Sequence, residues 1–129
     1  MNKTYLITAA LLGAVTVALG AFGAHGLKAK INDDHILGIF ETAVRYQFYH
    51  VFALLAVGIL FQFYGNAWML WSGRLFIIGM ILFCGSLYVL TYFLAAGNES
   101  MKWLGAITPF GGLSFIAGWV CMAVGILKS

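Results

Sequence analysis

The sequence predicts an all-α integral membrane protein whose four transmembrane helices form one antiparallel bundle. Of the 129 residues, 63% are hydrophobic and only 9% are charged, and the mean hydropathy is +0.97. Soluble domains carry about 25% charged residues. Four long apolar runs follow one another with short polar connections between them. We therefore expect one transmembrane domain over residues 1–129.

The first apolar run extends from Tyr5 to Ala24 and contains no charged residue; Lys3 precedes it. At about 1.5 Å of rise per residue, a helix of this length matches the roughly 30 Å hydrocarbon core of a bilayer. A cleavable secretory signal is the alternative interpretation, but its apolar region usually has about 7 to 15 residues. We expect this run to be the first membrane helix.

The next three runs are predicted at Tyr46–Tyr64, Leu75–Ala96 and Trp103–Leu127. Four spans place both termini on the same side of the membrane. The connection His25–Arg45 mixes charged and apolar residues, which predicts either an interfacial helix or an early start of the second helix. Asp33 and Asp34 suit the first turn of a helix, where its dipole favours negative charge.

The two remaining connections, Gly65–Arg74 and Gly97–Lys102, are short. The first of them contains two tryptophans. Lys and Arg number three on the terminal side and four on the other, so membrane orientation stays open. The seven basic and four acidic residues form no basic patch, which argues against nucleic acid as a partner and for membrane lipids. Cys84 and Cys121 have no CxxC spacing, and we expect both to be reduced.

Small residues recur at helical spacing in the first and fourth helices. They are Ala9, Gly13, Thr16, Gly20 and Gly23, and then Gly111, Ser114, Gly118, Cys121 and Gly125. A weaker strip in the third helix contains Ser72, Gly79 and Ser86. Small side chains let membrane helices approach closely. We expect the first and fourth helices to pack against each other or across a subunit interface, and the chain to form a homo-oligomer.

Polar residues gather where the first and third connections share a membrane face. This predicted polar pole consists of His25, Glu41, Arg45, Gln47, Tyr49, His50 and Thr108. The spacing of Glu41 and Arg45 permits an ion pair along one helix. Ionisable residues at membrane depth are also candidates for function. The two interpretations of this pair stay open.

His50 is predicted about one turn inside the second span. It can relay a proton, hold a polar ligand or bond a neighbouring carbonyl, and we favour the carbonyl. A metal or haem site at His25 and His50 lacks further ligands, so we expect no metal. Pro109 predicts a kink or a delayed helix start.

Four segments of the chain resemble one family of small bacterial membrane proteins. They are Gly20–Leu27, Phe40–His50, Gly85–Tyr88 and Ile107–Gly112. The family is domain of unknown function four-two-three, which is similar to the eukaryotic transmembrane protein two-five-six. Phe110 stands where an aliphatic residue is expected, a modest departure. The resemblance implies a four-helix protein of unassigned role, with no catalytic residues to carry over.

We therefore expect a multi-pass protein of the bacterial cytoplasmic (inner) membrane. The first function hypothesis is that it binds or passes a small polar or amphipathic molecule at the polar pole. A structural or accessory subunit that packs against other membrane proteins through glycine-rich faces is the alternative. An enzyme ranks third, because no nucleophile and base pair, metal cluster or cofactor fingerprint appears, and the sequence identifies neither ligand nor cofactor.

Overall fold

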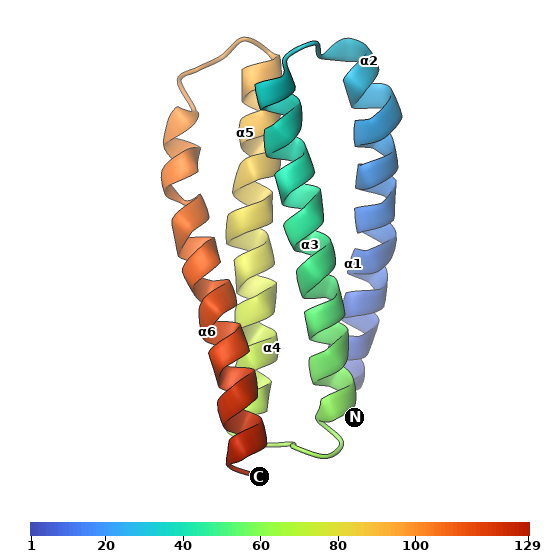
Figure 1. Cartoon of the computed structure of the whole chain (residues 1–129), viewed down its shortest axis with the longest axis vertical. Coiled ribbons are helices and arrows are strands. Elements are labelled where there is room, and N and C mark those ends of the chain that lie inside the picture. Colours follow the sequence, from blue (N-terminus) through green and yellow to red (C-terminus); the bar gives the residue numbers. More distant parts are fainter.

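The computed structural model describes residues 1–129 as four long antiparallel helices, with both chain ends at the same end of the bundle (Figure 1). The first long helix consists of α1 (Lys3–Phe22), a π-helical turn (Gly23–Leu27) and α2 (Lys28–Lys30). The second is α3 (Asp34–Leu60). These and the two helices that follow are each long and apolar enough to cross a membrane.

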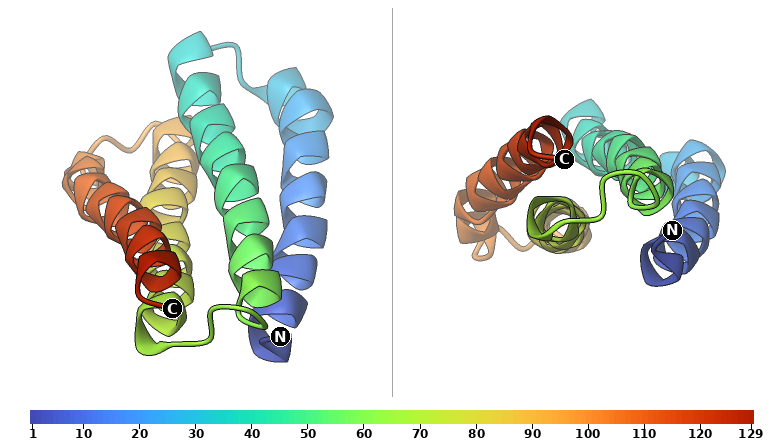
Figure 2. Two further views of the ribbon diagram at one scale, coloured as in Figure 1. Left: turned by 60° about the horizontal axis from the view of Figure 1, so that its bottom comes forward. Right: turned by 90° about the horizontal axis from the view of Figure 1, so that it is seen from below.

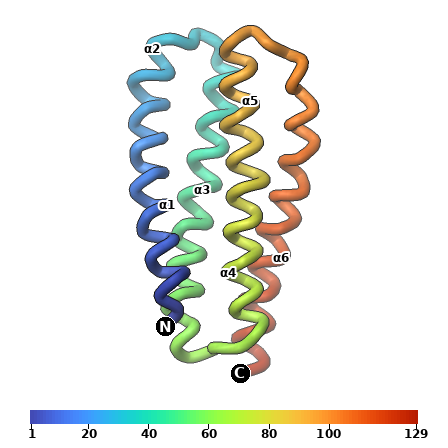
Figure 3. The backbone as a smooth tube through the Cα atoms, turned by 180° about the vertical axis from the view of Figure 1, so that it is seen from behind, coloured from blue at the N-terminus to red at the C-terminus, as the bar shows by residue number.

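The third long helix consists of α4 (Ala67–Gly79), a π-helical turn (Met80–Cys84) and α5 (Gly85–Ala95). A 3-10 turn (Lys102–Ala106) then leads into α6 (Thr108–Leu127). We call the end with both termini the terminal end and the opposite end the loop end. The backbone trace in Figure 3 shows the single connection at the terminal end and the two connections at the loop end.

The second and third helices begin earlier than their apolar runs predict. Helix α3 starts at Asp34, where Asp33 caps it by accepting a hydrogen bond from the His35 amide at 2.9 Å. This confirms the early start of the second helix, and Asp34 lies in its first turn as expected. Helix α4 starts after Asn66, whose side chain accepts from the Met69 amide at 3.1 Å. Both starts are set by capping side chains, which hydropathy does not register.

Helix α6 begins late, as Pro109 predicts. The residues before it form a 3-10 turn, and Pro109 lies in the first turn of α6. The missing amide of a proline costs little there, because the first amides of a helix have no intrahelical acceptor.

The two strips of small residues pack inside the chain, but not against each other. Seen from below, α1 and α6 lie at opposite sides of the bundle, with α3 and α4 between them (Figure 2). The α1 strip faces α3, since a Cβ added at Gly13 or Gly20 would contact a valine of α3 at 3.6 or 3.5 Å. The expected packing of the first helix against the fourth is wrong.

The α6 strip faces α4 and the π-helical turn that follows it. The Ser72 hydroxyl of α4 donates to the Gly118 carbonyl at 2.7 Å, and the Ser114 hydroxyl of α6 donates to the Leu75 carbonyl at 2.7 Å. A Cβ at Gly118 would lie 2.7 Å from the Phe76 ring. Both strips therefore pack within one chain, although Gly13, Gly20 and Gly23 of α1 and Cys121 of α6 are only partly buried. The homo-oligomer and the packing against other membrane proteins stay predictions.

The weaker strip of the third helix, Ser72, Gly79 and Ser86, is on the side that packs against α6, and all three residues are buried. We call this contact between the third helix and α6 the α4–α6 seam. The core beside it is apolar, with Leu54, Val57, Met69 and Phe76 almost fully buried. Cys84 and Cys121 are both free.

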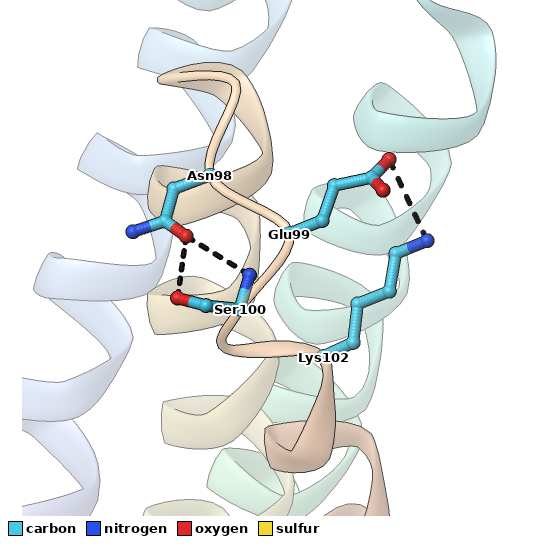
Figure 4. A network of polar contacts seen from close by, with 4 residues as sticks. All are labelled: Asn98, Glu99, Ser100 and Lys102. Carbon is cyan, nitrogen blue, oxygen red and sulfur yellow. Dashed lines mark hydrogen bonds and ion pairs between the residues drawn. The ribbon is translucent and has the colours of Figure 1, made fainter.

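The connection between α5 and the 3-10 turn is stabilised by local contacts (Figure 4). Gly97 adopts φ of 78°, and its amide and the next one bond back to the Leu94 and Phe93 carbonyls, which closes the end of α5. The Asn98 side chain then accepts hydrogen bonds from the amide and hydroxyl of Ser100. An exposed ion pair of 3.5 Å joins Glu99 to Lys102.

Candidate functional site

The structure divides the predicted polar pole into two groups. Gln47, His50 and Thr108 bond to protein groups inside the bundle. His25, Glu41, Arg45 and Tyr49 are exposed on its outer surface. Along α3 the division follows the face of the helix, because Gln47 and His50 are 5% exposed whereas Glu41, Arg45 and Tyr49 of the same helix are exposed. Since α3 starts at Asp34, Gln47 and His50 also lie near the middle of a helix about 40 Å long.

Gln47 joins three of the long helices. Its Nε2 donates to Thr16 Oγ1 of α1 at 2.7 Å, and its Oε1 accepts from the Tyr88 hydroxyl of α5 at 2.6 Å. Thr16 in turn donates to the Leu12 carbonyl at 2.6 Å. A buried amide bonded on both sides stabilises the bundle and has little capacity left for a ligand.

His50 lies about 24 Å along α3 from Asp34, so its predicted place one turn inside the span is wrong. Its Nδ1 is 2.8 Å from the Tyr46 carbonyl oxygen, which can only accept, so Nδ1 carries the proton. Its Nε2 accepts from Trp119 Nε1 at 3.2 Å. The ring stacks on Phe115 with centroids 3.5 Å apart. The preferred interpretation, a bond to a neighbouring carbonyl, is confirmed.

Thr108, at the start of α6, is hydrogen-bonded to α5 near the loop end. Its hydroxyl is 2.7 Å from the Ser86 hydroxyl, which also donates to the Phe83 carbonyl at 2.9 Å. Thr108 also lines a shallow depression with Asp34, His35 and Thr42 of α3. Its hydroxyl thus has a partner in a neighbouring helix.

Glu41 and Arg45 line a groove between α1 and α3, near the loop end. The α1–α3 groove has a volume of about 330 Å³. Its lining residues are Gly20, Gly23, Ala24, Phe40, Glu41, Val44, Arg45 and Phe48. This volume is at the lower end of the range for pockets that hold drug-sized ligands.

The ion pair that the spacing of Glu41 and Arg45 permits is not formed, because the chain has a single ion pair, between Glu99 and Lys102. Spacing brings two charges near each other, but exposed side chains gain little by pairing. Both charged groups therefore keep free hydrogen-bonding capacity beside the groove.

The groove exists because α1 carries small residues where α3 carries large ones. A Cβ added at Gly23 would lie 2.6 Å from the Phe40 ring, so this ring occupies the space that the glycine leaves. A Cβ at Gly20 would meet only Val44, at 3.5 Å. Gly20 and Ala24 thus leave an opening between the helices, with Phe40 at its base.

His25 and Tyr49 lie outside the groove lining. His25 is in the π-helical turn that extends α1, and Tyr49 is 53% exposed with its ring against Tyr46. His25 and His50 do not come together, and no three His, Cys, Asp or Glu side chains gather as metal ligands.

Sequence reasoning did not single out Phe40 and Phe48 as site residues. The usable signal was their spacing: they flank Glu41, Val44 and Arg45 on neighbouring turns of α3, opposite the small residues of α1. Gly20 and Gly23 were identified only as packing residues.

Comparison with known proteins identifies the family of this chain. Residues 19–112 match the family described as "Protein of unknown function (DUF423)". The chain belongs to this family. The matched residues include the α1–α3 groove, Gln47 with its partner Tyr88, and the start of α6, whereas Thr16, the other partner of Gln47, precedes them. No solved structure matches the chain.

Similar family members occur in bacteria and in yeast. A UPF0382 membrane protein of Staphylococcus aureus is 41% identical over 98% of this chain and 97% of its own length. One of Schizosaccharomyces pombe is 41% identical, over 90% of this chain and 95% of its own. The inner membrane protein YgdD of Escherichia coli is 37% identical, over 98% and 92%. The chain is thus a multi-pass protein of the cell membrane, from a family of unknown function.

Proposed function

We propose that this protein binds a small amphipathic molecule in the α1–α3 groove. The apolar part of the ligand lies along Val44, Phe40 and Phe48, and its polar part reaches Arg45 and Glu41. The observation that carries the proposal is that two unpaired charges share one groove within a membrane helix. Ionisable groups at membrane depth mark functional sites by default.

The depth of Arg45 strengthens the proposal. It follows Asp34 by about 16 Å of rise, in a helix about 40 Å long. If the excess over a 30 Å hydrocarbon core is shared between both ends, the Arg45 Cα lies roughly 10 Å inside the apolar layer. A guanidinium there must reach back to the interface or find an acceptor nearby. A ligand with hydroxyl, carboxylate or phosphate oxygens supplies such an acceptor.

The chemistry of the pair narrows the ligand class. Arg45 donates hydrogen bonds only, whereas ionised Glu41 accepts them only. One headgroup that carries both acceptors and donors satisfies the two residues together. This favours zwitterionic or polyhydroxylated headgroups over simple anions. The same geometry places residues Lys28–Asp34 in the headgroup layer, beside the opening of the groove.

Binding, and not passage across the membrane, is the role proposed. A transport path would continue from the groove to polar groups deeper in the bundle. Gln47 and His50 are buried polar groups at that depth, and both are 5% exposed and bonded to protein partners.

The test is mass spectrometry of small molecules that co-purify with the protein in mild detergent. We expect Arg45→Gln and Ala24→Phe to lose a species that the wild type retains. The first removes the charge, and the second fills the opening from an exposed position. Lys102→Gln is the control, since it removes an exposed cation at the same end, outside the groove. Equal retention by the wild type and both groove variants would rule the proposal out.

A further inference from the structure

A second opening lies at the terminal end, between α4 and α6, which run side by side there (Figure 1). This terminal slot has a volume of about 360 Å³ and is lined only by apolar residues. They are Ala67, Trp68, Trp71, Leu75 and Cys121. Because α4 begins at Ala67, the slot extends about 12 Å along the helix to Leu75. It begins at the first turn of a helix that is long and apolar enough to cross a membrane.

Each of the two tryptophans of the slot has a cationic side chain over its ring. The Arg74 guanidinium lies 5.0 Å from the Trp71 ring centroid, and the Lys128 Nζ lies 5.4 Å from that of Trp68. At such distances a cation is attracted to the face of an aromatic ring. Arg74 comes from α4 and Lys128 from the end of α6, so positive charge flanks the slot from both helices.

The charge at this end is unbalanced. All four acidic side chains of the sequence lie toward the loop end, at Asp33, Asp34, Glu41 and Glu99. The only ion pair of the chain is also there. Arg74 and Lys128 therefore have no acidic side chain near them to neutralise their charge.

We propose that the terminal slot binds one anionic phospholipid. One acyl chain lies between Trp68, Trp71 and Cys121, and the phosphate lies between Arg74 and Lys128. The apolar slot alone would accept any lipid chain. The two uncompensated cations select a headgroup with net negative charge over a zwitterionic one. This site is separate from the α1–α3 groove and does not depend on the function proposed for it.

The test is native mass spectrometry of the purified protein, titrated with dioleoyl phosphatidylglycerol or dioleoyl phosphatidylcholine. These probes share their acyl chains and differ in headgroup charge. We expect the first phosphatidylglycerol to bind more tightly than phosphatidylcholine. Each of Arg74→Gln and Lys128→Gln should weaken it about five-fold, and added salt should reduce the preference. Cys121→Phe keeps both cations but fills the slot, and it should also release the lipid.

Lys30→Gln is the matched control, because it removes one exposed cation near the loop end that lines neither the slot nor the α1–α3 groove. The proposal is overturned if the two lipids bind equally, or if Lys30→Gln weakens phosphatidylglycerol as much as Arg74→Gln does. It is also overturned if Cys121→Phe leaves lipid binding intact. The same holds if the slot variants retain the lipid but change the number of subunits in the purified protein. Thermal unfolding of each variant verifies that it is folded.

Discussion

The Tyr88 hydroxyl of α5 donates a hydrogen bond of 2.6 Å to the Gln47 side chain of α3. The Gln47 side chain in turn donates a hydrogen bond to Thr16 of α1, so one side-chain amide links three of the four long helices. A membrane interior offers no water to replace such a hydrogen bond. The measured free-energy contributions of hydrogen bonds between membrane helices are nevertheless modest.

Tyr88→Phe should lower the free energy of unfolding by about 1 kcal/mol, because it leaves Gln47 Oε1 without a donor. Thermal unfolding in detergent measures the loss. Tyr92→Phe is the control, since Tyr92 is 70% exposed and its hydroxyl has no partner in the protein. If both variants melt at the same temperature, the network does not stabilise the bundle.

Gly118→Ala should destabilise the protein by about 1 to 3 kcal/mol. The new methyl would meet the Phe76 ring at 2.7 Å and the Ser72 carbonyl at 3.3 Å, and the carbonyl belongs to the backbone. Gly85→Ala is the matched control, because a Cβ there meets nothing within 4 Å and alanine favours a helix. Equal unfolding temperatures would show that the seam tolerates the methyl group.

His50→Ala should cost about 2 to 4 kcal/mol, since it opens a cavity beside Phe115 and leaves Trp119 Nε1 without an acceptor. The small molecules that co-purify should stay unchanged, because His50 does not line the α1–α3 groove. Unfolding and mass spectrometry on one preparation separate the two effects. Loss of ligand at unchanged stability would instead make His50 a binding residue.

Asn66→Ala should destabilise the terminal end by about 1 to 2 kcal/mol. The variant loses the cap of α4 and also the hydrogen bond of 2.8 Å from Asn66 Nδ2 to the Gly125 carbonyl of α6. Asn98→Ala removes a side chain whose hydrogen bonds reach only Ser100, so it should cost a few tenths of a kcal/mol. A larger loss from Asn98→Ala would contradict this ranking of the two asparagines.

Much of the fold could be predicted from hydropathy, because an uncharged run such as Tyr5–Ala24 has no other stable environment than lipid. The starts of α3 and α4 could not be predicted from hydropathy, because the side chains of Asp33 and Asn66 set them by capping the helices. The small-residue strips predicted close packing correctly, but the partner helix depends on Phe83 and Phe76, which are not distinctive in sequence. The polar pole was defined by residue type, and only the structure separates Gln47 and His50, with bonded side chains, from Arg45, which lines an open groove.

The arrangement of seams has a consequence for biogenesis. α1 packs against α3, and α4 packs against α6, so each seam joins helices that are consecutive spans of the chain. The bundle is thus two neighbouring helical hairpins, and each can close as soon as its second member has been inserted. The order of synthesis matches the order of packing, and neither pair has to wait in lipid for a distant partner.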